Sequence, residues 1–542
     1  MIQLGQILLN KKKISRPQLE HALNIQKRTG EKLGRILSKY HFISEDDLVE
    51  ALSEQINVPI WDKPVSNIEH TLIEKIGLIQ AQHKGILPIV NDSGTPAILL
   101  EDPTNTLTIS FLVQHGLLYP RFIASPSLIK KNLEELVPIS DRISHLNSIV
   151  HEIEHFGISG NKMKEFLHSI IEEAIITNAS DIHIEPNVLT SDVRFRIDGM
   201  LTPIVSLPYH SHENLLNVVY SLASITQSEF SKFHDANFSF SYQNRTIDIR
   251  VSSIPTTKYG ASIVLRLLDR YKTIMPLKYL GYRKHQIDII QRLTFKPQGL
   301  FLFTGPTGSG KTTSLYSILS MLRTEEVKIL TIEDPVEVEL PLTQQVEVNE
   351  PAEITFSSAL RAFLRHDPDI VLVGEIRDKE TAVEAIRASL TGHKTFSTLH
   401  TQDTFTSITR LLDLDISLSY LGMSIEGIIS QRLIRKLCPL CKKEISVSQS
   451  YSEKIKAKTI YQPVGCNYCN NGYKGRTVAV EILEVKGNLK EVMKEGNYKK
   501  IKEEITEIQN NGFISLLQDG YYLIEQGITS IEEIERVVGS EN

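Results

Sequence analysis

A glycine-rich segment with a lysine and three threonines follows the apolar run 300–304. It comprises Gly305, Pro306, Thr307, Gly308, Ser309, Gly310, Lys311, Thr312 and Thr313. An apolar strand, a glycine turn and a helix over 314–322, in that order, are typical of a phosphate-binding loop. In such a loop backbone N–H groups surround a β-phosphate, Lys311 reaches the β- and γ-phosphates, and Thr312 offers its hydroxyl to Mg²⁺. The segment predicts ATP binding, and the alternative is a plain surface turn.

Carboxylates and a histidine follow three other apolar runs. Glu333 and Glu337 come after one predicted strand, Glu375 after a second and His400 after a third. The carboxyl ends of parallel strands face the crevice where ligands bind, so these acids are expected to hold Mg²⁺ through water and to polarise the attacking water. His400 could sense a γ-phosphate by hydrogen bonding. The alternatives are solvated acids at strand ends and a structural histidine.

The four cysteines form two C-x₂-C pairs, Cys438/Cys441 and Cys466/Cys469, with 24 residues between them. Two such pairs that converge on one ion give the tetrahedral set of a structural zinc site. A redox dithiol would need only one pair, and disulfides are rare in the cytoplasm. The spacing predicts Zn²⁺, with a thiol pair or metal-free cysteines as alternatives.

Length and composition limit the class of protein. A chain of 542 residues is long enough for three or four domains, and 41% apolar with 23% charged residues is typical of soluble globular proteins. The net charge of −6 excludes an overall field that attracts nucleic acid and leaves only a local basic patch. No stretch is as apolar and long as a membrane span, and the start does not resemble a secretory signal. We expect a cytoplasmic protein that meets the membrane through partners.

The first 56 residues contain a duplicated unit. Residues 4–26 realign on 33–55 at an offset of 29, with ten identical positions. Ser15 and Ser44 are predicted helix caps in the two copies, and apolar residues recur after each of them at helical spacing. Each unit is therefore expected to be a pair of short helices.

The remaining patterns divide the chain into further segments. The predicted segments are an N-terminal module (1–137, with the repeat and a small α/β part), a polar linker (138–161), a second α/β domain (162–270), a tether (271–281) and a nucleotide-binding domain (282–542). The last domain is expected to carry the cysteine segment 436–476 as an insert and to end in a helical tail, 488–538. The fold class is therefore multidomain α/β.

Several motifs, in order along the chain, resemble those of the secretion-superfamily ATPases. The similar segments are the Asp box (331–337), the arginine helix (356–369), the Walker B strand (373–378) and the His box (391–400). The cysteine pairs, the strand 180–186 and the turn 194–199 further resemble the assembly branch of that superfamily, the type IV pilus extension ATPases and type II secretion ATPases.

The resemblance implies a RecA-like P-loop domain preceded by a smaller, PAS-like α/β domain. It also implies a homohexameric ring that hydrolyses ATP and drives assembly of pili or secretion pseudopili through an inner-membrane platform protein. In this reading Glu337 activates water and Glu375 positions metal or water, with Glu333 as a second candidate for the same tasks. The expected location is the cytoplasmic face of the inner membrane, reached through partners.

Five arginines fall on family positions that supply charge at the nucleotide or at the subunit boundary. These are Arg194, Arg196, Arg361, Arg365 and Arg377. Arg361 and Arg365, four residues apart, are expected on one helix face, where they can act together on phosphate oxygens; a solvated basic face is the alternative. The segment 232–238 lacks the arginine that the family has there, so one contact across subunits is expected to be missing or replaced.

The duplicated unit resembles tandem units that bind cyclic di-GMP in some of these ATPases. Gln3 and Lys32 stand where those units have arginine, and Lys12 and His41 stand where they have glycine. The planar arginine fork can stack on guanine and grip phosphate, whereas lysine is a point charge and glutamine is neither. Two alternatives stay open for this module: cyclic di-GMP binding, and docking to a membrane-anchored adaptor.

A RecA-like nucleic-acid translocase is the alternative function. Such a protein should have basic loops rich in aromatic residues, which the net charge of −6 and the 7% aromatic content do not indicate. A non-hydrolysing signalling protein is a third reading, and the presence of Lys311, Glu337 and Glu375 argues against it. Pilus assembly and type II secretion fit the sequence equally well.

Overall fold

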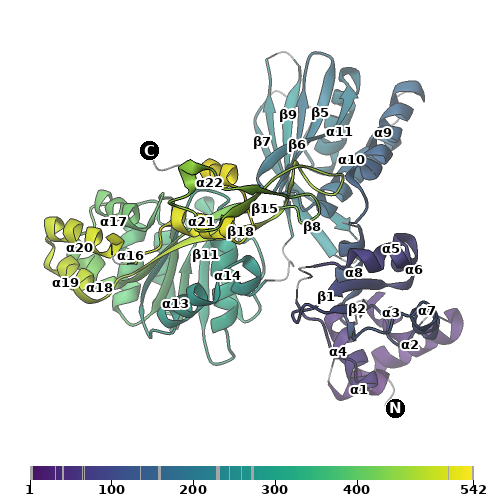
Figure 1. The fold of residues 1–542 in the computed structure, drawn as a ribbon, viewed down its shortest axis with the longest axis horizontal. Coiled ribbons are helices and arrows are strands. Elements are labelled where there is room, and N and C mark those ends of the chain that lie inside the picture. The colour runs from purple at the N-terminus through teal and green to yellow at the C-terminus, as the bar shows by residue number, and fades with distance from the viewer. Residues whose placement is uncertain are drawn as a thin grey trace.

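The computed structural model describes residues 4–11, 13–30, 32–39, 42–63, 65, 67–134, 136–156, 160–226, 232–242, 245–257, 259–269, 274–510 and 512–539. Figure 1 shows three bodies along the chain, which are an N-terminal module, a second domain built on one sheet, and a larger nucleotide-binding domain. The multidomain α/β class is as predicted. Three of the four variant positions of the repeat, Gln3, Lys12 and His41, lie outside the described residues, whereas Lys32 is described.

Four helices make up the duplicated unit. Ser15 and Ser44 cap the second and the fourth helix, each with a reciprocal capping box. Gly5 lets the first helix approach closely, because a Cβ there would lie 2.8 Å from Leu19. The helices are α1 (Leu4–Asn10), α2 (Arg16–Thr29), α3 (Leu33–Lys39) and α4 (Glu45–Ile56).

A small α/β part completes the N-terminal module. Its three-stranded sheet has the order β1 (Ile86–Val90), β2 (Pro96–Leu100) and β3 (Arg121–Ile123). The first two strands pair antiparallel and the last two parallel. The accompanying helices are α5 (His70–Ile76), α6 (Leu78–Lys84), α7 (Thr106–Gln114) and α8 (Pro126–Glu134).

The segment predicted as a linker, 138–161, contains helix α9 (Ile139–Phe156), so that prediction is wrong. Leu146, Ile149 and Ile153 recur at helical spacing, and all three are buried in the core of the second domain. Polar residues on the outer face of this helix gave the segment its linker-like composition. The helix therefore belongs to the second domain.

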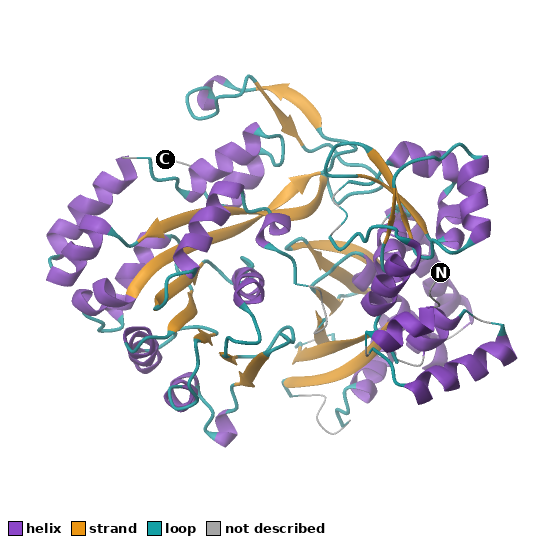
Figure 2. Cartoon of the chain, turned by 90° about the horizontal axis from the view of Figure 1, so that it is seen from below, coloured by secondary structure: helices purple, strands orange, loops and turns teal. Residues whose placement is uncertain are grey.

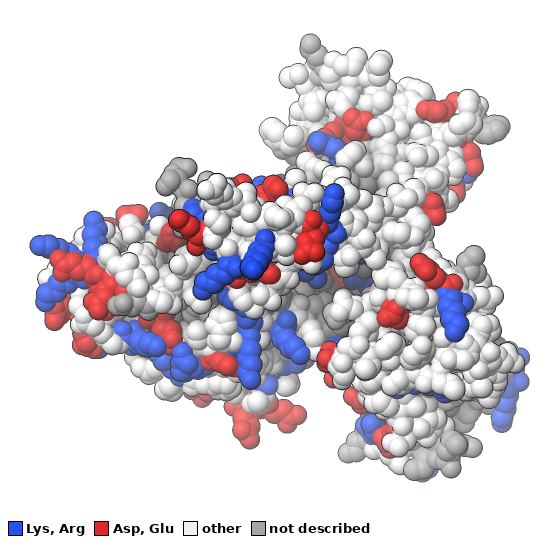
Figure 3. Space-filling view, in the orientation of Figure 1, with Lys and Arg blue, Asp and Glu red and all other residues white. Residues whose placement is uncertain are grey.

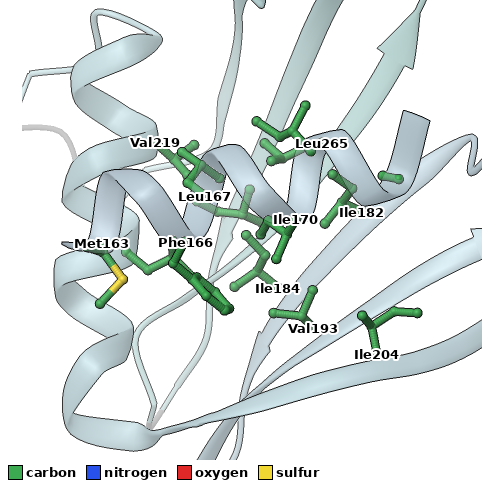
Figure 4. Packing of buried hydrophobic residues seen from close by; sticks show 14 of the residues in the cluster. Met163, Phe166, Leu167, Ile170, Ile182, Ile184, Val193, Ile204, Val219 and Leu265 are labelled. Atoms are coloured by element: carbon green, nitrogen blue, oxygen red, sulfur yellow. The ribbon is translucent and has the colours of Figure 1, made fainter. Parts of the chain in front are cut away.

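In the second domain a six-stranded antiparallel sheet packs against α10 (Gly160–Ile176) and α11 (His212–Leu222). Figure 4 shows Phe166 and Ile170 of α10 near Ile184 and Val193 of the sheet. The strand order is β6 (Met200–Pro208), β5 (Thr190–Ile197), β4 (Asp181–Pro186), β9 (Ala261–Leu268), β8 (Arg245–Pro255) and β7 (His234–Tyr242). Strands β6 and β7, which the sequence pattern does not predict, are the two edge strands of this sheet.

The nucleotide-binding domain is built on a seven-stranded sheet. All neighbouring strands are parallel except the last pair, which is antiparallel. The strand order is β12 (Thr343–Glu347), β11 (Ile329–Glu333), β13 (Ile370–Val373), β14 (Lys394–Leu399), β10 (Gly299–Thr304), β15 (Ile425–Leu437) and β18 (Tyr473–Glu484). The carboxyl ends of β10, β11, β13 and β14 therefore meet at one edge.

Helices cover both faces of this sheet (Figure 2). They include α13 (Lys284–Thr294), α14 (Lys311–Leu322), α15 (Phe356–Phe363), α16 (Lys379–Leu390), α17 (Thr404–Asp413) and α18 (Leu418–Ser424). Leu300 and Leu302 of β10 join the core under α15 and α16, whereas Phe301 and Phe303 join the core under α13 and α14. The central strand is thus apolar on both faces, as its continuous apolar run predicts.

Part of the predicted tether belongs to this domain. Helix α12 (Leu277–Leu280) lies inside the segment 271–281, and Leu277 is buried together with Tyr282 in the core beside α14. The tether is therefore shorter than the sequence analysis expects.

The cysteine segment lies between the antiparallel strands β15 and β18. It contains the hairpin β16 (Lys443–Ser446) and β17 (Thr459–Gln462). The chain then ends in α19 (Gly487–Glu495), α20 (Tyr498–Asn510), α21 (Leu516–Glu525) and α22 (Ile531–Val537), in the region predicted as a helical tail. Among the described residues, none of the helices combines the length and the hydropathy that crossing a bilayer requires.

Candidate active site

The glycine-rich loop connects β10 directly to α14. Gly305, Gly308 and Gly310 have positive φ angles of 148°, 78° and 85°, which favour glycine. Gly305 also has no room for a side chain, because a Cβ there would lie 2.7 Å from the carbonyl oxygen of Gln431. Helix α14 begins at Lys311, so its first backbone N–H groups point into the loop. This is the geometry of an anion-binding helix start.

Side chains from distant parts of the chain hold the loop. The Gln431 side-chain amide donates to the carbonyl oxygen of Ser309 at 2.6 Å. The buried Tyr282 hydroxyl lies 2.7 Å from Oε1 of Gln431 and 2.9 Å from the Ser314 hydroxyl. Arg432 lies on the same strand and donates to the carbonyl oxygen of Gln402 at 2.5 Å. None of these residues is a predicted site residue, although Gln431-Arg432 is a polar pair inside an apolar strand and could have indicated a role.

Lys311 is almost completely buried and is held by the loop itself. Its ammonium group donates to the carbonyl oxygens of Gly305 at 2.8 Å and Pro306 at 3.2 Å. Burial lowers the pKa of Lys311 to about 8, while the carboxylates of Glu375 and Glu337 oppose this shift. A bound phosphate would favour the charged form of this lysine in the same way.

Glu375, just beyond the end of β13, contacts two other predicted site residues. One oxygen lies 3.4 Å from Nε2 of His400 at the end of β14, and the other forms an ion pair with Arg377. Arg377 also lies 3.7 Å from Asp334. Burial, followed by the charge of Lys311, lowers the pKa of His400, so its neutral form is favoured. A carboxylate, an arginine and a neutral imidazole thus meet beside the phosphate loop.

Glu333 and Glu337 differ in their surroundings. Glu333 is buried, and its carboxylate accepts hydrogen bonds from the hydroxyls of Tyr316 and Thr331 and from the Gln345 amide. Burial raises the pKa of Glu333. Glu337 is exposed and lines a cavity. Of these two acids, Glu337 is the one whose side chain is exposed and lines the cavity.

That cavity has a volume of about 430 Å³ and lies beside α14. Thr313 and Glu337 line it from the nucleotide-binding domain, and Ile197 and Asp198 line it from the second domain. Its lining is mostly apolar with a few polar groups, and its size is that of a small-ligand site. A nucleotide held by the phosphate loop can extend into this space.

The four cysteines lie together in one cluster. Their sulfur atoms all lie within 4.8 Å of one another, with Sγ–Sγ distances of 3.9 Å for Cys438/Cys466, 3.7 Å for Cys441/Cys469 and 3.6 Å for Cys466/Cys469. A tetrahedron with Zn–S bonds of about 2.3 Å has edges of about 3.8 Å. Disulfide bonds would instead bring two sulfurs to about 2 Å. The cluster therefore fits one zinc ion and no disulfide.

The comparison with protein families identifies the chain. Residues 159–536 match the family described as type II/IV secretion system protein. The chain is a member of this family. The matched range covers the second domain except α9, and it includes the phosphate loop, both acid-bearing loops and the cysteine segment.

Members of this family are similar over most of the chain. The type IV pilus assembly ATPase PilB of Myxococcus xanthus is 32% identical and aligns over 98% of this chain and 98% of its own. The type II secretion system ATPase E of Vibrio cholerae is 39% identical over 69% of this chain and 75% of its own. The ATPase DotB of Legionella pneumophila has a similar fold, with a TM-score of 0.54 and 23% identity over 68% of this chain and 94% of its own.

The remaining arginines that the family resemblance singled out lie farther from the loop. Arg194 forms an ion pair with Glu185, and Arg196 donates to the carbonyl oxygen of Gly199 at 3.1 Å. Both lie on β5 of the second domain. Among the described residues, no contact joins either arginine to the phosphate loop, so within this chain they do not complete the site.

Arg361 and Arg365 are adjacent but not on one helix. Helix α15 ends at Phe363, two residues before Arg365, because the chain turns toward Asp367 and Pro368. The Arg365 guanidinium nevertheless donates to the carbonyl oxygen of Arg361 at 3.0 Å. Both side chains are exposed, and Arg361 also lies 3.5 Å from the carboxylate of Glu384.

Proposed function

We propose that this chain is an ATP-hydrolysing motor that acts as a homohexamer and drives assembly of type IV pili or type II secretion pseudopili. One observation carries the proposal: the phosphate loop, Lys311, Glu337, Glu375 and His400 converge at one edge of a parallel sheet. The names of its family relatives, which are pilus assembly and secretion ATPases, support the direction of the proposal. The partners would be an inner-membrane platform protein and a membrane-anchored adaptor, and the location the cytoplasmic face of the inner membrane.

In this function each residue has a defined task. The loop N–H groups and Lys311 bind the phosphates of ATP, and Thr312 would hold Mg²⁺, which neutralises charge on the β- and γ-phosphates. Glu337 faces the cavity and takes a proton from the attacking water. Glu375 holds His400 and Arg377 where they can bind the γ-phosphate.

A nucleic-acid translocase is not favoured. In Figure 3 basic and acidic side chains alternate over the nucleotide-binding domain, and no continuous basic surface is visible on this face. Nucleic-acid translocation would need such a surface.

The function is tested by ATP turnover and by a deletion strain. Purified protein should release phosphate in a Mg²⁺-dependent reaction, and loss of the gene should remove either surface pili or a secreted protein. Each phenotype selects one of the two pathways. A protein that binds ATP without hydrolysing it under any condition that promotes ring assembly would contradict the motor.

The boundary arginines supply a prediction about the ring. If Arg196, Arg361 and Arg365 complete the site of a neighbouring subunit, Arg196→Ala should reduce turnover by about tenfold to a hundredfold, because the γ-phosphate loses a charge partner. The fold should persist, since this partly exposed charge contributes little to the domain. Turnover measured against protein concentration, with light scattering in a slowly hydrolysed ATP analogue, tests both points. Concentration-independent hydrolysis by a monomer would contradict a shared site.

The cysteine cluster supplies a prediction about metal. We expect one zinc ion per chain, and Cys438→Ser should release it and unfold the segment 438–472 while the nucleotide-binding sheet stays intact. Elemental analysis and proteolysis of the released segment measure these outcomes. Ser450 is exposed in the same segment, so Ser450→Ala is the matched control, and this variant should retain zinc. If the protein contains no zinc after purification without a chelator, the predicted zinc site is wrong.

For the N-terminal module we propose docking to the adaptor rather than cyclic di-GMP binding. The ammonium group of Lys32 donates to Asp102 at 2.5 Å and lies 3.3 Å from the Thr104 hydroxyl. Asp102 therefore already neutralises the positive charge of Lys32, which a dinucleotide phosphate would need for binding. Calorimetry with cyclic di-GMP tests this choice, and micromolar binding would reverse it.

A further inference from the structure

The segment that carries Glu337 is held by three side chains. The backbone N–H groups of Val336, Glu337 and Leu340 donate to the side chains of Glu347, Tyr316 and Gln345, at 3.1, 3.4 and 2.7 Å respectively. Glu347 and Gln345 lie on β12, the edge strand that pairs with β11. Tyr316 lies on α14, the helix that starts at Lys311.

The Tyr316 hydroxyl is oriented by a second acid. Tyr316 is buried, with 2% of its surface exposed, and it donates its proton to the carboxylate of Glu333. Because that proton is used, the oxygen of the hydroxyl can only accept, and the group placed to donate to it is the N–H of Glu337. Glu333 is itself fixed by Thr331 and Gln345. The chain of contacts therefore runs from Glu333 through Tyr316 to the backbone of Glu337.

We propose that Tyr316 is a positioning residue that ties Glu337 to the nucleotide-bearing helix, and that Glu333 acts only by orienting Tyr316. The inference rests on the proposed hydrolysis and adds how the water-activating acid is kept in register with the phosphates. Lys311 and Tyr316 lie on the same helix. A phosphate bound by Lys311 is therefore held in a fixed position relative to the Glu337 backbone, which Tyr316 contacts. A misplacement of about 1 Å of a catalytic group can cost about a hundredfold in rate.

The test compares buried tyrosine hydroxyls. Tyr316→Phe should lower kcat by about tenfold to a hundredfold with KM for ATP within about threefold, because ground-state phosphate contacts are unchanged and the Glu337 contact acts in the transition state. Tyr220→Phe is the matched control, since the Tyr220 hydroxyl is also buried and lies 2.6 Å from the Ser253 hydroxyl in the second domain. It should lose similar thermal stability and keep both kinetic constants. Equal kinetics for the two variants would overturn the proposal.

A second pair of variants separates the two acids. Glu333→Gln should keep kcat within about tenfold of the parent, and adding it to Tyr316→Phe should cost little more, because both act through one contact. If Glu333→Gln is as inactive as Glu337→Gln, Glu333 takes part in the chemistry and the proposal fails.

Hydrogen exchange tests the contact without relying on turnover. The Glu337 amide, followed in the peptide 333–340, should exchange up to about tenfold faster in Tyr316→Phe than in the parent or in Tyr220→Phe. Unchanged exchange would overturn the positioning role even if hydrolysis occurs. Absence of Lys311-dependent turnover in the parent would instead contradict the proposed function, while the exchange result would still decide the contact.

Discussion

Lys311→Ala should reduce ATP turnover by about a thousandfold or more. The β- and γ-phosphates lose their main cationic partner where charge develops in the transition state, inside a site that excludes water. The fold should tolerate the change. Burial lowers the pKa of Lys311 to about 8, so without phosphate the charged ammonium group does not stabilise the folded state. Steady-state phosphate release and a thermal melt measure the two effects.

Lys394 supplies a matched control for this variant. Burial also lowers the pKa of Lys394, but this lysine begins β14 and so lies at the opposite edge of the sheet from the phosphate loop. Lys394→Ala should keep turnover within about threefold of the parent. Turnover of the Lys311 variant within tenfold of the parent would remove the loop from the mechanism.

Glu337→Gln should lower turnover by about a hundredfold to a thousandfold while leaving ATP binding in place. The amide is similar in size to the carboxylate but cannot accept the proton of the attacking water, and general-base catalysis contributes about this much. A fluorescent ATP analogue measures binding and phosphate release measures turnover. Binding should stay close to that of the parent, because in the proposed mechanism Glu337 acts on the attacking water and the phosphates are bound by the loop and Lys311.

Glu339→Gln is the control, since Glu339 is exposed on the same loop two residues farther along. It should behave like the parent. If Glu337→Gln turns over ATP within tenfold of the parent and Glu375→Gln does not, water activation belongs to Glu375 and its neighbour His400.

Local features were predictable where the interaction that creates them is short in sequence. The loop from Gly305 to Thr312 follows from glycine conformations, an adjacent strand and an adjacent helix. Ser15 and Ser44 were predictable as helix caps because a cap bonds to a residue three positions away. A continuous apolar run likewise located β10, whose neighbours in the sheet it did not identify.

Other predictions were wrong because a tertiary contact outweighed composition or helical spacing. The segment 138–161 has a polar composition, yet Leu146, Ile149 and Ile153 form an apolar face of a helix. This face stabilises the helix only because it is buried in the core of the second domain. Arg361 and Arg365 have helical spacing, but the helix ends before the second arginine.

The sequence by itself determined the chemistry of this protein: the residue types of the phosphate loop, the acids after the strands, and the spacing of the cysteines are each encoded within a few residues. Tertiary structure decided the surroundings of the two acids after β11. Tyr316, Thr331 and Gln345 donate hydrogen bonds to the buried carboxylate of Glu333, whereas Glu337, which the family resemblance favours for water activation, is exposed and lines the cavity. Burial and hydrogen-bond partners depend on residues brought together by folding, and spacing along the chain does not contain that information.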